Sequence, residues 1–396
     1  MPTDLRKFDV IVLGAGAAGL MCAATAGERG RRVVLLEHNG QPGRKILISG
    51  GGRCNFTNLH CGPANYLSEN PHFAKSALAL YEPRHFIELV ERYGIHWHEK
   101  TLGQLFCDHS ARSIVEMLLA ECARGGVETV LNARRILVEG AASGGFRVAC
   151  SLGEFTADAL VVATGGLSIP KMGATGIGYE LARQFGLKIV NPRPALVPLL
   201  LGGEESAWTE LAGVATEVVV HTSGAGRKAE FREKMLLTHR GLSGPAVLQV
   251  SSYWRAGDEL HVDFAPEIRV LGALMEPRAV RGEALLRQAL REVLPQRLAG
   301  LLAERCDPGG WSNAALEGCE RRLHAWRFHP TGTEGFDKAE VTAGGVDTSD
   351  LNARTMEARS VPGLFFIGEA VDVTGWLGGF NFQWAWASGV AAGRAV

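Results

Sequence analysis

The sequence predicts an α/β fold in which a Rossmann-like nucleotide-binding domain is interrupted by an insert. Three observations support this fold class: a strand-type segment runs into a glycine-rich turn at residues 9–19, antiparallel strand-type alternation follows at about 195–264, and helical spacing follows at 269–328. After residue 336 the glycine-rich strand pattern returns, so the chain is expected to leave the nucleotide domain and re-enter it. The expected parts are residues 1–191 and 336–396 for the nucleotide domain, 192–266 for a β-rich insert and 267–335 for a helical insert.

The composition is that of an ordinary globular protein with one unusual feature. Hydrophobic residues make up 46% of the 396 residues and charged residues 21%, but 50 residues are glycine. Glycine at this level, without a repeating period, indicates many tight turns or close approaches of backbone to a ligand. The formal net charge of -1 provides no global basic field for a nucleic acid, although a local basic patch stays open.

Cysteine usage and hydropathy suggest the compartment. The eight cysteines show neither a CxxC pair nor the spacing of a zinc site, so no metal is expected. No apolar segment is long enough to span a bilayer, and the N-terminal one is too short for a signal peptide. We therefore expect reduced thiols, a cytoplasmic protein and no membrane contact. The sequence does not predict the oligomeric state.

The N-terminal segment has the residue order of a dinucleotide-binding βαβ unit. Strand Asp9–Leu13 leads into the turn Gly14–Gly19, a helix of small residues runs to about Glu28, and strand Arg32–Leu36 ends on Glu37. The glycines permit a tight turn and a close approach to a pyrophosphate, and the helix N-terminus favours phosphate. Glu37 is placed to accept hydrogen bonds from both hydroxyls of a ribose, which favours FAD or NAD over a 2′-phosphorylated nucleotide.

Two further segments favour FAD and a domain of the glutathione-reductase type. A short β-meander at Phe146–Ala159 returns to an apolar strand, Leu160–Gly166, that ends in ATGG. Near the C-terminus the strand Leu364–Ile367 is followed by glycine and Glu369, an acid expected to bond the ribityl or pyrophosphate region. The helix expected at Phe380–Arg394 would direct its positive N-terminus at the flavin ring and favour the negative charge of the reduced form. The alternative is an ordinary turn before a helix.

The segment Ile48–Asn55, ISGGGRCN, places three glycines beside a cation, a thiol and an amide. Cys54 and Cys61 are seven positions apart, which is roughly 10 Å of rise on a helix and beyond disulfide reach, so a redox disulfide is not expected. Cys54 is interpreted as a packed or flavin-adjacent thiol. A nucleophile or proton donor is the alternative, and Cys54 stays a weak catalytic candidate.

Other segments carry weaker signals. Gly173–Gly178 is predicted to be a loop and helix start near the cofactor, because Pro170 breaks the preceding strand. His239 lies in a glycine-rich turn, where it is either a structural residue or a weak candidate for acid–base catalysis. Val247–Ser251 and Glu259–Phe264 alternate like strands.

The chain resembles the BaiN/YhiN-type NAD(P)/FAD-dependent oxidoreductases, also called the aminoacetone oxidase family of FAD-binding enzymes, in the motifs GAGAAGL, GRKILISGGGRCNFTN, ATGG, THRGLSGPAVLQVS, EVTAGGV and PGLFFIGEAVDVTGWLGGFNFQWAWASG. The resemblance spans nearly the whole chain. It implies non-covalent FAD, NAD(P)H as a transient electron donor, and an insert with a β-barrel-like part and a helical part. One departure is Cys107, where the family usually has proline.

The resemblance and the motifs together define a set of residues expected to contact FAD. They are Gly14, Gly16, Ala17, Ala18, Gly19, Glu37, His38, Arg44, Lys45, Ser49, Gly51, Gly52, Arg53, Cys54, Asn55, Ile136, Thr164, Gly165, Gly166, Gly368, Glu369, Gly379, Phe380 and Asn381. For Arg44, Lys45 and Arg53, the alternative role is that of solvated charges on the surface.

The leading functional hypothesis is a FAD-dependent oxidoreductase in which NAD(P)H reduces the flavin and hydride then passes to an activated C=C bond. The resemblance implies either a steroid-type enone or a uracil ring of ribosomal RNA as the substrate, and the choice between a small molecule and RNA stays open. The alternatives are a flavin amine oxidase that uses oxygen, and a FAD-binding protein without turnover. The C-terminal third also resembles fumarate-reductase-type flavoproteins, in TAGGV and PGLxxxGE, and this resemblance implies an arginine as proton donor in the glycine-rich block. Fumarate-type chemistry is disfavoured because Gly375–Asn381 contains no arginine.

Overall fold

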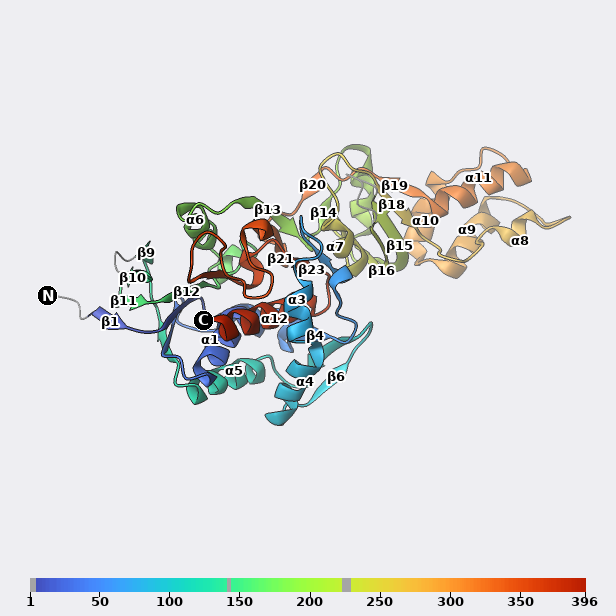
Figure 1. Cartoon of the computed structure of the whole chain (residues 1–396). Helices are drawn as coiled ribbons and strands as arrows, with labels where there is room; N and C mark the ends of the chain where they lie inside the picture. Colours follow the sequence, from blue (N-terminus) through green and yellow to red (C-terminus); the bar gives the residue numbers. More distant parts are fainter. Residues whose placement is uncertain (1–4, 141–143, 223–228) are drawn as a thin grey trace. The chain divides into compact units, whose positions relative to one another are not determined.

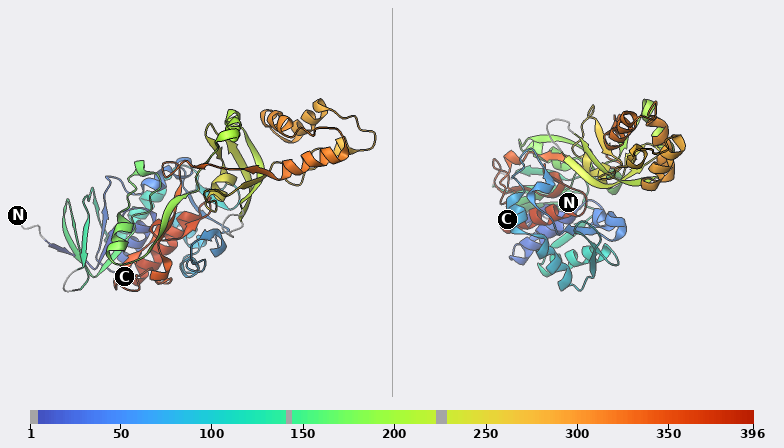
Figure 2. Two further views of the ribbon diagram at one scale, coloured as in Figure 1. Left: turned by 90° about the horizontal axis from the view of Figure 1, so that it is seen from above. Right: turned by 90° about the vertical axis from the view of Figure 1, so that its right-hand side faces the viewer.

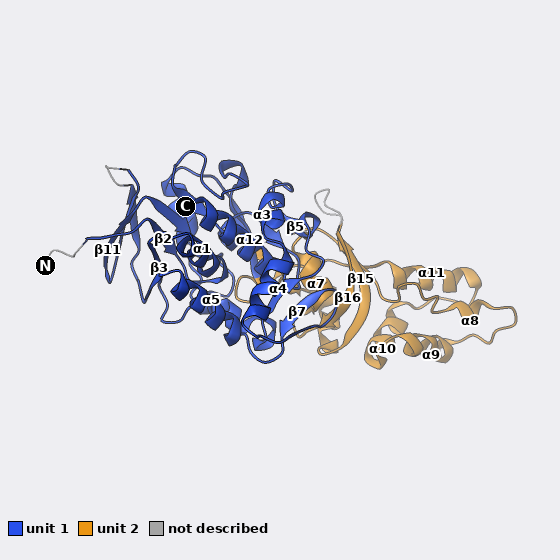
Figure 3. Ribbon diagram, turned by 60° about the horizontal axis from the view of Figure 1, so that its bottom comes forward, with its two compact units in different colours: residues 1–193, 341–396 blue, residues 194–340 orange. Residues whose placement is uncertain are grey.

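The computed structural model describes residues 5–140, 144–222 and 229–396 (Figure 1). The chain divides into two compact units, the first formed by residues 1–193 and 341–396 and the second by residues 194–340 (Figure 3). The first unit is thus assembled from two separate stretches of sequence, and the second lies between them in the chain. The finer division of the insert at residue 266 stays a prediction.

The first unit is built around a parallel five-stranded sheet with the strand order β22-β12-β2-β3-β8. The strands are β22 (Leu364–Phe366), β12 (Ala159–Val162), β2 (Val10–Leu13), β3 (Val33–Glu37) and β8 (Glu128–Leu131). The four strands other than β8 are buried along their whole length. Continuous apolar runs are typical of such a sheet, because helices cover both faces. The Rossmann-like α/β fold class is confirmed.

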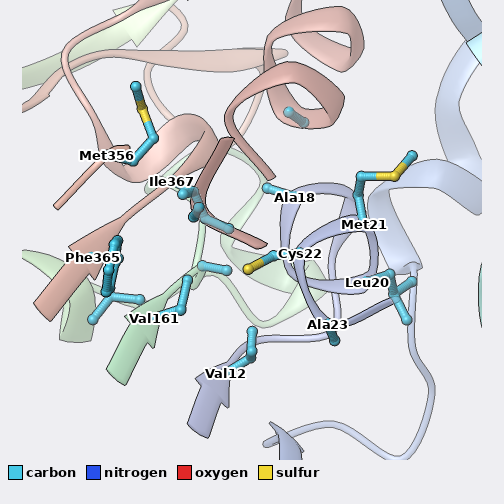
Figure 4. Packing of buried hydrophobic residues seen from close by; sticks show 14 of the residues in the cluster. Val12, Ala18, Leu20, Met21, Cys22, Ala23, Val161, Met356, Phe365 and Ile367 are labelled. Carbon is cyan, nitrogen blue, oxygen red and sulfur yellow. The ribbon is translucent and has the colours of Figure 1, made fainter. Parts of the chain in front are cut away.

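Helix α1 (Ala17–Glu28) packs along helix α12 (Phe380–Ala395), as Figures 1 and 2 show. The two backbones approach closely because α12 carries glycines at the contact: a Cβ on Gly389 would lie 2.7 Å from the Ala18 carbonyl oxygen, and one on Gly393 would lie 2.7 Å from the Cys22 carbonyl oxygen. Figure 4 shows the apolar core at this place, where Val12, Val161 and Phe365 of the sheet pack near helix α1. The C-terminal segment is therefore part of the nucleotide-domain core.

Smaller elements surround this sheet. The predicted meander is present as an antiparallel ladder of β9, β10 and β11, which β1 extends in parallel. A second antiparallel sheet has the order β4-β7-β6. The bounds are β1 (Leu5–Lys7), β9 (Leu137–Gly140), β10 (Phe146–Cys150), β11 (Gly153–Ala157), β4 (Asn55–Asn58), β7 (Gln104–Cys107) and β6 (Trp97–Glu99).

The remaining helices and short strands of the first unit connect these sheets. The helices are α2 (Arg44–Ile48), α3 (Lys75–Leu80), α4 (Pro83–Arg92), α5 (Arg112–Arg124) and α6 (Ile177–Gln184). The short strands are β5 (Tyr66–Leu67) and β23 (Thr374–Gly375), which pair, and β13 (Ile189–Ala195) and β21 (Val341–Val346), which also pair.

The second unit contains a seven-stranded sheet with the order β19-β18-β15-β16-β17-β14-β20 and a group of helices. The strands are β14 (Leu199–Leu200), β15 (Ala215–Thr222), β16 (Ala229–Leu237), β17 (Gly241–Ser243), β18 (Leu260–Asp263), β19 (Trp326–Phe328) and β20 (Gly332–Thr333). The helices are α8 (Gly272–Met275), α9 (Glu283–Val293), α10 (Gln296–Arg305) and α11 (Asn313–His324).

One expected strand is wrong. Val247–Ser251 belongs to helix α7 (Pro245–Ser251), not to the sheet. Gly244 turns the chain with φ +86°, and Pro245 occupies the first helical turn, where its missing N–H costs no hydrogen bond. These start signals outweigh the weak strand preference of the two valines. Within the described ranges, no helix is both long enough and apolar enough to cross a membrane.

Candidate FAD site

The turn between β2 and α1 uses its three glycines for different purposes. Gly14 has φ +103°, and a Cβ there would lie 2.5 Å from the Ala163 carbonyl oxygen. A Cβ on Gly19 would lie 1.9 Å from the Gly14 carbonyl oxygen, so helix and turn are in backbone contact. A Cβ on Gly16 would meet no heavy atom within 4 Å. The turn is therefore closed at its first and third glycines and open at the second, where a pyrophosphate needs bare backbone.

Glu37 ends β3 beside this turn and is 6% exposed. Its carboxylate accepts hydrogen bonds from the backbone N–H groups of Ala15 and Asn39, both at 2.8 Å, and lies 3.1 Å from Nδ1 of His38. Burial opposes ionisation, yet His38 and the two amides hold the pKa of Glu37 below its ordinary value. The same pairing raises the pKa of His38. An ionised carboxylate at the end of the second strand is the group that a ribose needs.

The second acid, Glu369, is held by a network of side chains. Its carboxylate pairs with Nζ of Lys45 at 2.7 Å and accepts hydrogen bonds from Oγ of Ser168 and the backbone N–H of Thr342, both at 2.9 Å. Burial would raise the pKa of Glu369, but Lys45, Ser168 and Thr342 hold it below the ordinary value. Lys45 is therefore neither a solvated surface charge nor an unpaired one. Its positive charge stabilises the acid that follows β22.

The ATGG segment after β12 contains the clearest sign of a missing partner. The hydroxyls of Thr164 and of Tyr179 on α6 are buried, and neither has a hydrogen-bond partner in the part of the chain that the structure describes. Gly165 has φ +74°, and a Cβ there would meet no heavy atom within 4 Å. Buried hydroxyls without partners are rare, because each one costs about 1–3 kcal/mol. Polar atoms of a bound cofactor would satisfy them.

The ISGGGRCN loop has three consecutive residues in the left-handed region: Gly50 (φ +57°), Gly51 (φ +67°) and Gly52 (φ +84°). Gly51 is exposed, and a Cβ there would meet no heavy atom within 4 Å. Arg53 is exposed and makes no ion pair within the described ranges. Bare backbone beside an unpaired cation fits the approach of an anionic group.

Cys54 has φ +51°, is fully buried, and donates its backbone N–H to the Ser49 carbonyl oxygen at 3.0 Å. Burial raises the pKa of the Cys54 thiol, and the contact with Ser49 offsets this only in part. All eight cysteines are free. A neutral, inaccessible thiol is a packing group, so the structure favours the packed interpretation of Cys54 over a nucleophile.

The N-terminus of α12 is fixed by its neighbours. Gly379 has φ +97°, and a Cβ there would lie 2.3 Å from the Thr57 carbonyl oxygen. With the Asn55 amide in the orientation that satisfies both its oxygen and its nitrogen, the oxygen accepts from the Gly379 N–H at 3.3 Å. The Asn381 side-chain amide accepts a hydrogen bond from the Gly375 N–H at 2.8 Å and donates one to the Gly375 carbonyl oxygen at 2.9 Å. Asn55 and Asn381 therefore use their side chains to shape the loop, and a contact of either with FAD stays a prediction.

The side chains of α12 in and after the QWAW segment hold distant segments in place, a role that no local sequence pattern indicates. Gln383 accepts from the Thr57 hydroxyl and donates to the Tyr81 carbonyl, both at 2.7 Å. Trp386 donates to the Phe56 carbonyl at 2.8 Å. Trp384 donates to the Gly368 carbonyl at 3.0 Å, and Ser388 accepts from the Gly368 N–H at 3.0 Å. These bonds fasten β4 and the Gly368 turn to one helix.

The other expected residues lie at several places. Arg44 donates to Oδ1 of Asn39 at 2.9 Å, in the segment that follows Glu37. Ile136 is partly buried against the apolar core, and Phe380 is 5% exposed and in edge contact with Tyr66. His239 is exposed and belongs to the second unit. Ala17 and Ala18 lie in the first turn of α1, and Ser49, Gly166 and Gly368 lie in turns and loops of the first unit.

Comparison with known proteins agrees with this geometry. Residues 8–395 match the family described as HI0933-like protein Rossmann domain. The chain therefore belongs to the HI0933-like family. It is a FAD-dependent oxidoreductase. The open backbone at Gly16 and Gly165 and the unpartnered hydroxyls of Thr164 and Tyr179 fit a bound FAD. The cofactor would rest on the Gly14–Gly19 turn and the ATGG segment, between the side chains of Glu37 and Glu369. Within the described ranges, no cluster of three or more His, Cys, Asp or Glu side chains is placed to hold a metal ion.

Relatives in the family have assigned activities. A ribosomal RNA dihydrouridine synthase of Escherichia coli (strain K12) is 48% identical over 401 residues, covering 98% of both chains. The protein of the same name from Haemophilus influenzae is 43% identical, also over 98% of both chains. A 3-dehydro-bile acid delta(4,6)-reductase of Clostridium scindens is 32% identical over 97% of this chain and 98% of its own.

A solved structure with a similar fold is the 3-ketosteroid-delta4-(5alpha)-dehydrogenase of Rhodococcus jostii RHA1 in complex with 4-androstene-3,17-dione. Its TM-score is 0.50 at 14% sequence identity, over 98% of this chain and 97% of the other. At this identity the likeness concerns the fold alone.

Proposed function

We propose that this protein uses NAD(P)H to reduce the C5=C6 bond of uracil rings in ribosomal RNA, giving dihydrouridine. The observation that carries the proposal is the 48% identity, over 98% of both chains, to a ribosomal RNA dihydrouridine synthase. The site supports the proposal chemically because the thiol of the glycine-rich loop, Cys54, is buried and free, so it is not available for disulfide or thiolate chemistry.

When bound, FAD supplies the hydride, which it accepts first from NAD(P)H. The residues of the chain bind and orient the cofactor. Glu37 is proposed to hold the ribose, Gly16 to admit the pyrophosphate, and Glu369 with Lys45 to hold the ribityl region. The first turn of α12, positioned by Asn55 and Gly379, is proposed to direct its positive end at the flavin ring, where it would favour the negative charge of the reduced form.

A conjugated enone of a small molecule is the second candidate substrate, supported by the 32% identity to a bile-acid reductase. The two substrates share one reaction, since both present a C=C bond conjugated to a carbonyl. An amine oxidase that uses oxygen and a FAD-binding protein without turnover remain alternatives that an experiment separates. Both ribosomal RNA and NAD(P)H would be met in the cytoplasm, which we propose as the location.

The test uses the full-length holoprotein with an unmodified ribosomal RNA transcript and NADH or NADPH, under argon. Mass spectrometry of the digested RNA is expected to reveal a nucleoside that has gained two hydrogens, and the product should be absent without the nicotinamide. A steroid enone and an amine are tested in parallel. Consumption of the enone alone would favour the second candidate, and peroxide formed from the amine in air without nicotinamide would favour the oxidase.

A further inference from the structure

Reduction of a conjugated C=C bond needs a proton as well as a hydride, and the residues proposed above to hold FAD are not assigned to donate it. Cys54 is buried. The sheet β4-β7-β6 provides a different group. His98 on β6 directs Nδ1 at Oδ1 of Asp108, 2.7 Å away, and the two side chains are 42% and 36% exposed.

The histidine ring is held in a fixed orientation. It stacks on Phe106 with a centroid distance of 6.2 Å and an interplanar angle of 17°. The carboxylate of Asp108 contacts Nδ1, which favours a proton on that nitrogen and leaves Nε2 outside this contact. Nε2 makes no hydrogen bond to any described residue. By contrast, both ring nitrogens of His324 and of His329 are occupied by carboxylates.

The position of His98 follows from strand register. His98 pairs with Phe106, and Phe106 pairs with Asn55, so the three side chains lie on the same face of the sheet. The opposite face is buried, because Phe56 packs there against Trp97 and Phe86. Two strand spacings separate His98 from Asn55, which is roughly 10 Å.

This face adjoins two of the loops expected to hold FAD. The Phe106 ring lies directly under the glycine-rich loop, since a Cβ on Gly50 would be 2.7 Å from its Cε1 atom. Asn55 contacts the Gly379 N–H at the start of α12. Lys100 places Nζ 5.4 Å from the centroid of the same Phe106 ring, so a cation and an imidazole flank it. Asp108 therefore contacts His98 directly, and Lys100 contacts the Phe106 ring on which His98 stacks.

We propose that His98 is the proton donor of the reduction, positioned by Asp108. The inference rests on the proposed function for its reductant, NAD(P)H. Hydride forms a C–H bond at C6 of the uracil, the C5=C6 π electrons move towards the C4 carbonyl, and C5 takes the proton from Nε2 of protonated His98. His98 then regains a proton from water, so the cycle consumes one NAD(P)H and one proton for each double bond.

The first experiment separates the two half-reactions by rapid mixing under argon. H98Q is expected to reduce its flavin with NAD(P)H at the wild-type rate, and to be reoxidised by the RNA transcript about 10²–10³-fold more slowly. D108N should slow the same step less. H96Q is the matched control, because His96 is an exposed histidine two positions away. An unchanged flavin absorption spectrum and thermal midpoint would exclude misfolding. Wild-type reoxidation in H98Q would overturn the proposal.

The second experiment follows the proton directly. In D₂O the wild type is expected to place deuterium on one face of C5, whereas H98Q should give both faces, because solvent then protonates the intermediate. A slow H98Q that keeps single-face labelling would overturn the proposal. The half-buried thiol of Cys61, which lies 2.9 Å from the Tyr66 hydroxyl, would then be examined with C61S. If the wild type reduces an enone but not RNA, the proposed substrate fails, and the same labelling of the enone still tests His98.

Discussion

The two glycine-rich turns of the first unit, Gly14–Gly19 and Gly50–Gly52, look alike in sequence but differ in structure. In the first, Gly14 and Gly19 are in backbone contact with their surroundings, and only Gly16 is open. In the second, all three residues have positive φ, and Gly51 and Gly52 would place a Cβ in nearly open space. Gly14 and Gly19 of the first turn are thus required because backbone lies against them, whereas Gly51 and Gly52 of the second turn are required for their conformation alone. The comparison separates the residues that form the fold from those that admit a ligand, and substitutions at these positions test it.

The largest effect is expected for G19A. The added Cβ would lie 1.9 Å from the Gly14 carbonyl oxygen, and backbone cannot move aside there without separating α1 from the sheet. We expect no soluble, FAD-containing protein, measured by expression, absorbance and circular dichroism. The control is G30A, since Gly30 has φ +82° but no neighbour within 4 Å. G30A should remain folded at a cost of about 1–2 kcal/mol. A folded, yellow G19A would show that the close contact is not required.

G16A is expected to weaken FAD binding and leave the fold intact. Gly16 has φ -81° and no neighbour near a Cβ, so alanine should change the stability of the apoprotein by at most about 1 kcal/mol. Occupation of the open space should lower FAD affinity roughly 100-fold, or about 2.7 kcal/mol. Titration of the apoprotein with FAD, followed by fluorescence, measures this affinity. Wild-type affinity in G16A would mean that the pyrophosphate does not pass over this residue.

E369Q is expected to have a smaller effect, on the stability of the apoprotein, than G16A has on the free energy of FAD binding. It leaves Lys45 without its carboxylate, but the Lys45 side chain is 33% exposed, so the cost is expected to be about 1–2 kcal/mol. Because the pKa of Glu369 is held below its ordinary value, its contribution is present above about pH 4.3 and is lost as pH falls through the folded-state pKa. Urea unfolding between pH 3 and 7 compares E369Q with K45M and the double variant. Additive effects of the two single substitutions would contradict the pairing.

The smallest effect is expected in the second unit, for H324Q. His324 lies 2.8 Å from Asp263 and 3.2 Å from Glu320. Partial burial opposes the charged form, yet the two carboxylates raise the pKa of His324. Its contribution, about 0.5–1 kcal/mol, is therefore fully present below about pH 6.5 and is lost as pH rises through the folded-state pKa. Thermal midpoints of wild type and H324Q should differ at pH 6 and converge at pH 9. A difference in thermal midpoint that is the same at pH 6 and pH 9 would show that the charge of His324 does not cause it.

The sequence was sufficient to predict features that depend on the spacing of residues close together in the chain. The βαβ unit, Glu37 at the end of its second strand and the strand before Glu369 could be predicted because spacing alone places them. Contacts between segments that are far apart in the sequence could not be predicted. The bonds from Gln383 and Trp386 to β4 join residues more than three hundred positions apart, and the pair His98–Asp108 depends on strand register. The strand expected at Val247–Ser251 is wrong because Gly244 and Pro245 start a helix there.

The most direct test of the proposed activity is anaerobic titration of the yellow holoprotein in two steps. NADH or NADPH should first bleach the bound flavin, and unmodified ribosomal RNA should then restore its colour, with one dihydrouridine formed for each flavin reoxidised. Failure of both NADH and NADPH to bleach the flavin, or a bleached flavin that only oxygen restores, would contradict the account.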